Sequence, residues 1–113
     1  MNENMEILIS KVLGGHAKNK YTKIEVIKHL GEHDMHRLLE TEILLSDKDV
    51  KVKMAILDQF RNHPDIIQIK NILAEIIVSK NEDETIKKEA LIIFQNNYGK
   101  DVILGHKKLE LDE

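Results

Sequence analysis

The chain of 113 residues is long enough for one domain with its own hydrophobic core, and 42% of its residues are hydrophobic. It has no cysteine, no recognisable secretory leader and only short apolar runs, which excludes disulfides, thiolate metal sites and membrane spans, so we expect a cytoplasmic protein. Because the net charge is −3 and the signs are interspersed, the composition also disfavours general nucleic-acid binding, which needs a basic stripe.

The first part of the chain predicts three helices from its periodicity and its capping residues. The first covers about residues 4–13 and ends at Gly14 and Gly15, because glycine permits the left-handed backbone of a helix C-cap. The second covers about residues 21–31, with Gly31 at its end. The third begins after Asp34, an N-cap residue, and ends near Ser46.

Three further helices are predicted downstream. A fourth helix, capped by Asp47 or Asp49, reaches about Asn62. The fifth begins at Pro64, since proline suits the first turn of a helix, and ends near residue 79. The sixth covers about residues 83–98. The sequence therefore predicts an all-α domain of three helical pairs, at about residues 1–33, 34–63 and 64–98.

The second helix of each pair repeats one motif. Lys53 and Lys87 occupy the same slot, 34 residues apart, and each follows an aliphatic residue and precedes apolar residues three and seven positions later. Lys23 occupies this slot in a more worn first copy, 30 residues before Lys53. Repeats of this length are typical of stacked supersecondary units.

The repeated motif resembles the signature that opens the second helix of HEAT repeats, particularly the bacterial HEAT-like type. Two sets of residues match the signature Asp-x-x-Val-Arg/Lys-x-x-Ala-x-x-x-Leu: Asp49, Val52, Lys53, Ile56 and Phe60, and then Asp83, Ile86, Lys87, Ala90 and Phe94. The resemblance covers about residues 1–98, with lysine in place of the usual arginine and without the usual turn proline. It implies a short right-handed α-solenoid of three helical pairs, whose second helices form a concave ridge for a partner protein.

We therefore expect a non-catalytic protein–protein interaction module: a regulator, an adaptor or an inhibitor, including an immunity-type protein. No cofactor and no enzymatic activity are expected, because the chain has no glycine-rich phosphate loop, nucleophile elbow or nucleophile with a histidine relay. Homodimerisation is an alternative mode of association. Nucleic-acid binding by the lysine-bearing ridge is an alternative function.

The binding surface is predicted from the helical wheels of the second helices. Ten residues in matching outward slots form this predicted ridge: Tyr21, Ile24, Lys28, Lys51, Met54, Asp58, Arg61, Lys88, Ile92 and Gln95. Tyrosine, methionine and arginine are favoured at interfaces because they supply large contact area, and Met54 is expected near the centre. The alternative is that the three apolar members, Ile24, Met54 and Ile92, pack in the core.

Charged residues also occur at predicted core positions. Lys53 falls within the apolar arc of its helix and needs acceptors there, and its recurrence indicates a ladder of contacts between neighbouring repeats rather than an acid–base pair with Asp49. Glu42 lies within the apolar arc of the third helix, and Lys11 fills the equivalent slot of the first. We expect Lys11 and Glu42 to form a buried pair, with exposure of both as the alternative.

His29, His33 and His36 form the one cluster with metal-ligand character. Two histidines four residues apart on a helix can hold a metal ion together. The competing interpretation is a polar C-cap, because His33 and His63 occupy the same repeat slot and Gly31 interrupts the second helix. Metal binding through His29, His33 and His36 is kept as an alternative function.

Residues 99–113 form a tail that fits neither helix type. The terminal repeats of a solenoid have an open apolar flank that must be covered. We interpret the tail as a cap on the third helical pair. A disordered end and a partner-binding peptide are the alternatives.

Overall fold

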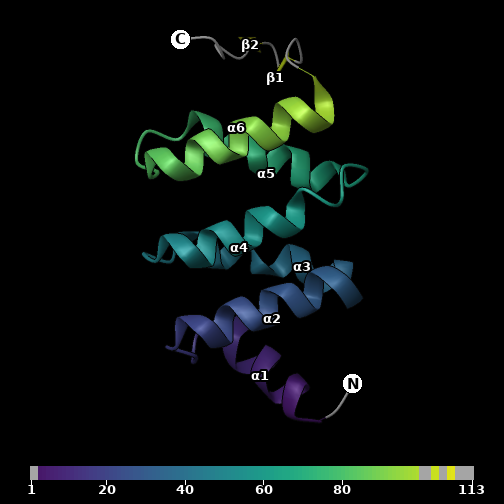
Figure 1. The fold of residues 1–113 in the computed structure, drawn as a ribbon, viewed down its shortest axis with the longest axis vertical. Helices are drawn as coiled ribbons and strands as arrows, with labels where there is room; N and C mark the ends of the chain where they lie inside the picture. The colour runs from purple at the N-terminus through teal and green to yellow at the C-terminus, as the bar shows by residue number, and fades with distance from the viewer. Residues whose placement is uncertain (1–2, 100–102, 105–106, 109–113) are drawn as a thin grey trace. The chain divides into compact units, whose positions relative to one another are not determined.

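A computed structural model describes residues 3–99, 103–104 and 107–108 of the chain, and these residues are mostly helical (Figure 1). In chain order the elements are α1 (Glu3–Leu13), α2 (Lys20–His33), α3 (Met35–Glu40), the 3-10 helix η1 (Thr41–Ser46), α4 (Val50–Phe60), α5 (Ile67–Val78), α6 (Glu84–Tyr98), β1 (Ile103–Leu104) and β2 (Lys107–Lys108). The two strands pair antiparallel, with Ile103 opposite Lys108 and Leu104 opposite Lys107. The all-α class predicted from the sequence is confirmed.

The chain divides into two compact units, which are described separately. The first unit, Met1–Phe60, contains α1 to α4 with η1. The second unit, Arg61–Glu113, contains α5, α6 and the strand pair. Among the described residues, no helix combines the length and the apolar character that a membrane span requires.

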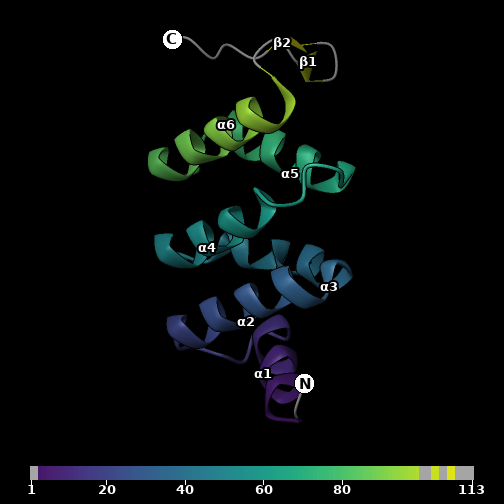
Figure 2. The same cartoon turned by 45° about the vertical axis from the view of Figure 1, so that its right-hand side comes forward.

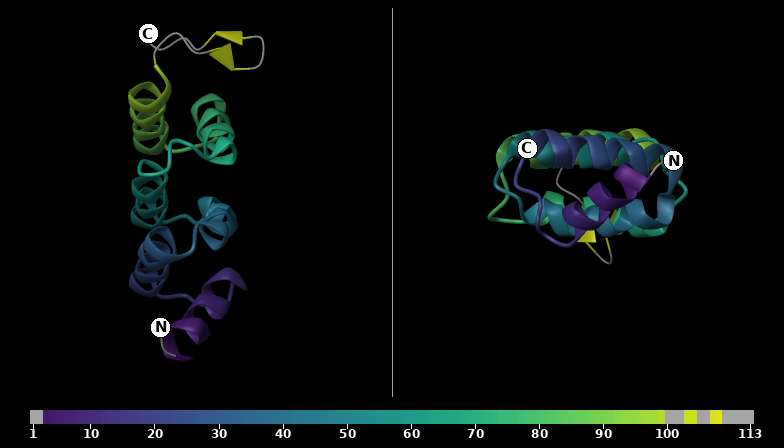
Figure 3. Two further views of the ribbon diagram at one scale, coloured as in Figure 1. Left: turned by 90° about the vertical axis from the view of Figure 1, so that its right-hand side faces the viewer. Right: turned by 90° about the horizontal axis from the view of Figure 1, so that it is seen from below.

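In the first unit, α2 and α4 lie side by side in one layer, and α1 and α3 with η1 form a second layer against them (Figure 3). Apolar residues recur every three or four positions along these helices, so one face of each helix is buried between the layers. The core of the first unit is formed by Ile9, Val12, Val26, Ile27, Leu30, Leu38, Leu44, Val52, Ala55, Ile56, Leu57 and Phe60.

The predicted helix caps at Asp34 and Asp49 are confirmed. Asp34 Oδ1 accepts a hydrogen bond from the backbone N–H of Arg37 at 3.2 Å, and α3 begins after it. Asp49 Oδ1 accepts the backbone N–H of Lys51 at 2.8 Å at the start of α4. Because the first N–H groups of a helix have no partner within the helix, each carboxylate satisfies a donor that would otherwise need water.

Gly15 ends α1, as predicted. Its φ angle is +81°, in the left-handed region that glycine adopts without steric cost. Its N–H donates to Val12 O at 3.2 Å, and the N–H of His16 donates to Lys11 O at 2.8 Å. These two bonds form the Schellman pattern that satisfies the last carbonyls of a helix.

Gly31 does not end α2, contrary to the prediction. The helix continues to His33, and Gly31 is buried within it. A Cβ atom at Gly31 would clash with the side chain of Gln59 on α4. Glycine at this position therefore leaves room for the Gln59 side chain, which is a different role from a helix stop.

The predicted third helix changes type at Thr41, where α3 gives way to η1. The Thr41 hydroxyl is buried and donates to Leu38 O at 2.6 Å. A 3-10 helix has three residues per turn, so Leu38, Thr41 and Leu44 share the buried side. Glu42 and Ile43 lie on the exposed side.

Pro64 lies three residues before α5 and does not start this helix, so the predicted start of the fifth helix is wrong. The N–H of Ile66 donates to His63 O at 3.3 Å, so Pro64 is the second residue of a turn, a position that its fixed φ angle favours. Helix α4 correspondingly ends at Phe60, short of Asn62.

In the second unit, α5 and α6 pack as an antiparallel pair (Figure 2). Their buried residues are Ile69, Ile72, Leu73, Ile76, Ile86, Ala90, Ile93 and Phe94. The ring of Tyr98 lies 5.1 Å from that of Phe94, and its hydroxyl donates to Pro64 O at 3.1 Å. The predicted tail cap depends on residues 100–102, 105–106 and 109–113, which lie outside the described residues.

Candidate functional site

Six of the predicted ridge residues lie on the neighbouring helices α2 and α4 of the first unit, and we call them the first-unit ridge. The four exposed residues are Tyr21, Lys28, Lys51 and Asp58. The two half-buried residues are Ile24 and Met54. Tyr21 is 65% exposed, and the ammonium of Lys20 lies 5.4 Å from the centroid of its ring. Neither Ile24 nor Met54 is fully buried, so the apolar members of this ridge remain accessible.

The other four ridge residues lie in the second unit. Lys88 and Ile92 are exposed on α6, with Ile92 at 41%, and Gln95 is half-buried. Arg61 precedes the turn at Pro64, and its guanidinium forms an ion pair with Glu89 Oε2 at 2.5 Å. Arg61 is therefore held against α6.

Three further exposed aliphatic residues lie on α1, η1 and α5. They are Ile7, Ile43 and Val78, with exposed fractions of 53%, 61% and 60%. Each belongs to a doublet of adjacent apolar residues. In other doublets, such as Ile56–Leu57 and Ile93–Phe94, both members are fully buried. A doublet therefore does not by itself identify which apolar residues are exposed.

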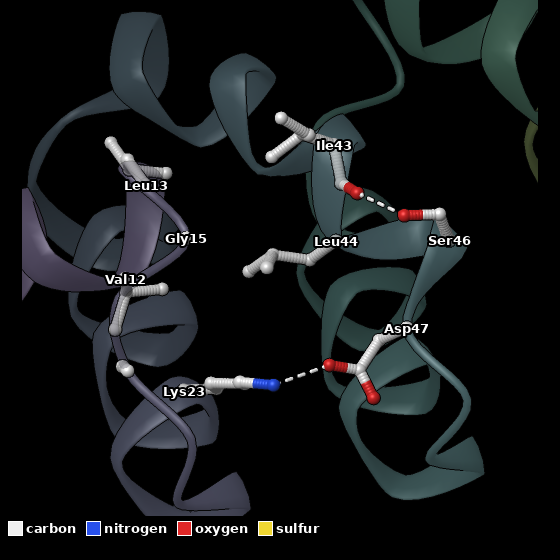
Figure 4. A pocket seen from close by; sticks show the side chains of 9 residues that line it. Val12, Leu13, Gly15, Lys23, Ile43, Leu44, Ser46 and Asp47 are labelled. Carbon is white, nitrogen blue, oxygen red and sulfur yellow. Dashed lines mark hydrogen bonds and ion pairs between the residues drawn. The ribbon is translucent and has the colours of Figure 1, made fainter.

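A hollow of about 210 Å³ lies in the first unit, between the end of α1, the α1–α2 loop, α2 and η1 (Figure 4). It is lined by Val12, Leu13, Gly15, Ala17, Lys23, Ile43, Leu44, Ser46 and Asp47. Apolar side chains from α1 face those from η1 across the hollow. At one side Lys23 Nζ and Asp47 Oδ2 meet at 2.5 Å.

The ion pair of Lys23 and Asp47 is largely shielded from water, since each side chain is 16% exposed. Burial by itself would raise the pKa of the Asp47 carboxyl. Hydrogen bonds from Lys23 and from the backbone N–H of Asp49, together with the positive charges of Lys23 and Lys53, outweigh burial and hold this pKa below its usual value. Asp47 is therefore anionic at neutral pH.

The repeated lysine makes different contacts in different copies of the motif. Lys23 on α2 reaches Asp47 in the segment before α4, as a contact between neighbouring copies requires. Lys87 instead pairs with Glu84, three residues earlier on α6, at 3.8 Å. Lys53 is half-buried. The predicted contact between neighbouring copies of the motif is thus present at Lys23. Lys87 makes a contact within its own helix instead.

The predicted buried pair of Lys11 and Glu42 is wrong, because both residues are exposed. The 3-10 geometry of η1 is the physical reason, since it moves Glu42 out of the apolar arc that a regular α-helix would give it. The layer that contains these residues has another ion pair, between Glu6 on α1 and Arg37 on α3, at 3.1 Å.

The histidine cluster is only partly assembled. Because α2 continues through Gly31, His29 and His33 lie together, with ring centroids 4.6 Å apart. His36 lies on α3, beyond the cap at Asp34. Within the described part of the chain, no three His, Cys, Asp or Glu side chains gather as a metal site requires. The three-histidine site considered from the sequence is therefore not formed by these residues.

The first unit thus offers two candidate binding surfaces, the first-unit ridge and the hollow beside Lys23 and Asp47. Comparisons of the chain with models of protein families, with curated proteins and with solved structures found no match. The HEAT-like resemblance accordingly depends on the motif around Lys53 and Lys87, and it remains a hypothesis.

Proposed function

We propose that this chain is a HEAT-like helical-repeat protein that acts without catalysis, by binding another protein along the outward side of α2 and α4. In this proposal α6 supplies a further patch with Lys88 and Ile92. The protein would serve in the cytoplasm as a regulator, an adaptor or an inhibitor, including one of the immunity type.

The observation that carries this proposal is the accessibility of Tyr21, Ile24 and Met54 on the two adjacent helices α2 and α4. Tyr21 is 65% exposed, and the other two side chains are half-buried. A tyrosine and two apolar side chains grouped on a surface can bury large contact area in a complex at little entropic cost. Such a group favours an interface over a solvated surface.

The charges of the first-unit ridge suit the same use. Lys28, Lys51 and Asp58 are exposed around the apolar members, where charges of both signs select a complementary partner. The repeated lysines Lys23 and Lys87 have carboxylate partners within the chain. This internal pairing, with the net charge of −3, favours a protein partner over a nucleic acid.

The experiment begins with affinity capture from the native host and identification of the captured protein by mass spectrometry. Binding of the purified partner is then measured for the parent, Tyr21→Ala and Met54→Asp. Each substitution is expected to weaken binding by roughly tenfold or more if the residue is a central contact. Tyr21→Ala is the cleaner test, because this exposed side chain contributes little to folding.

The matched control is Glu40→Lys, which changes an exposed residue of α3 in the opposite layer. Circular dichroism checks that every variant is folded. Ridge variants that fold and bind like the parent, with loss of binding in Glu40→Lys, would place the partner on the layer of α1 and α3 instead.

A further inference from the structure

The size of the hollow in the first unit limits what can occupy it. Its volume is about 210 Å³. Pockets for drug-sized ligands are usually larger, from about 300 Å³ upward, whereas a cavity of about 150 Å³ already admits benzene. The hollow therefore has room for one branched aliphatic side chain and little more.

The walls of the hollow combine apolar surface with one charged donor. Ile43 is 61% exposed at its edge and Leu13 is half-buried, so apolar area remains available to an incoming side chain. The ammonium of Lys23 has three N–H donors, and Asp47 is its hydrogen-bond acceptor among the described residues. A ligand carbonyl or carboxylate could accept from another of these donors.

The charges around the hollow favour an acidic ligand. Residues 7–24 contain no Asp or Glu but carry four lysines and His16. Lys20 and Lys23 are paired with Asp49 and Asp47, respectively. The remaining charges next to lining residues are exposed and form no ion pair in the part of the chain that is described; they are Lys11, Lys18, Lys48 and Glu42. The charges adjacent in sequence to the lining residues are thus three cations and one carboxylate, which is a net positive charge.

We propose that this hollow binds an acidic peptide segment of a partner protein by enclosing one leucine or isoleucine side chain. The backbone carbonyl next to that anchor accepts a hydrogen bond from Lys23, and acidic residues on either side of it face Lys11 and Lys18. None of the lining residues belongs to the first-unit ridge, so this is a second contact site that is independent of the proposed ridge interface.

The chain itself contains a segment with the required composition, which supplies the probe. Residues 109–113 read Leu-Glu-Leu-Asp-Glu. A synthetic peptide of this sequence, acetylated and amidated, is titrated into the isotope-labelled protein, and amide shifts are followed by NMR. The titration is repeated on the chain carrying Leu109→Ala and Leu111→Ala, so that its own segment cannot compete.

The expected result is saturable shifts at Gly15, Ala17 and Ile43, without shifts at Tyr21 and Met54. Ile43→Asp is expected to weaken binding by roughly tenfold or more, because it removes apolar contact and adds a negative charge. Lys18→Glu is expected to weaken binding by a few-fold, and less so at high salt, since exposed charges are screened. Ile7→Asp is the matched control, because Ile7 is 53% exposed on α1 and does not line the hollow.

Three results would overturn the proposal. The first is a lack of shifts around the hollow at millimolar peptide in both forms of the chain. The second is equal binding of a peptide with alanine in place of both leucines, since the anchor is then irrelevant. The third is equal affinity of Ile43→Asp and Ile7→Asp. Failure of the ridge variants to affect partner binding would leave all three results unchanged, so the two proposals can fail separately.

Discussion

The repeated lysine is used differently in the two units. In the first unit, Lys23 contacts Asp47, 24 residues away, and both side chains are 16% exposed. In the second unit, Lys87 contacts Glu84 one helical turn away, where the glutamate is 89% exposed. The same residue type in the same motif slot thus makes a shielded tertiary contact in one unit and a local surface contact in the other.

The apolar slots of the motif behave in the opposite way. Phe60 closes the motif in the first unit and Phe94 closes it in the second, and both are fully buried. An apolar slot needs only a core to pack in, whereas a charged slot needs a particular acceptor at a particular place. A repeat in sequence therefore predicts burial more faithfully than it predicts ion pairs.

The largest expected effect tests the equivalence of the apolar slots. Phe60→Ala and Phe94→Ala should each lower the free energy of unfolding by about 3–5 kcal/mol, because each removes a fully buried aromatic ring and leaves a cavity. Urea denaturation followed by circular dichroism measures both values. A lowered free energy of unfolding in only one of the two variants would show that the two apolar slots are not equivalent.

A smaller effect should separate the two lysine contacts. Asp47→Ala should cost about 1.5–3 kcal/mol, because it leaves Lys23 largely buried without its acceptor. Glu84→Ala is the matched variant, and it should cost no more than about 0.5 kcal/mol, since the glutamate is exposed. Equal costs for the two variants would remove the distinction between the units.

The smallest expected effect is a dependence of stability on pH. The Asp47 carboxyl should make the stability of the first unit sensitive to acid. Its pKa is lowered in the folded state, so folding favours the ionised form. The resulting stability is complete above the pKa of an unfolded aspartate, about 3.9, and is lost as the pH falls through the lower folded-state value. The stability difference between the parent and Asp47→Asn should therefore shrink on acidification, and a difference that grows would contradict the assignment.

The sequence predicted the existence and order of the helices well. The caps at Asp34 and Asp49 and the stop at Gly15 were identifiable because each depends on a local rule for helix ends. Gly31 was predicted to end a helix and Pro64 to start one, and both predictions are wrong. The space at Gly31 is limited by the Gln59 side chain on α4. Pro64 lies in a turn that precedes α5, at a position three residues before the helix begins.

The candidate site was predicted less completely. The outward slots of α2, α4 and α6 are accessible, as the helical wheels suggested. The hollow was not foreseen, because it depends on how α1 and η1 face each other and on the exposure of Ile43. Helical wheels assume about 100° per residue, and that assumption does not hold between Thr41 and Ser46.

The 3-10 geometry of η1 also affects how far the segment of α3 and η1 extends. A 3-10 helix rises about 2.0 Å per residue and an α-helix about 1.5 Å, so α3 and η1 together extend about 21 Å, the same as α2 with two more residues. Regular α-helix over Thr41–Ser46 would shorten this element by about 3 Å. Asp47 directly follows η1, so the stretched segment acts as a spacer that delivers its carboxylate within reach of Lys23.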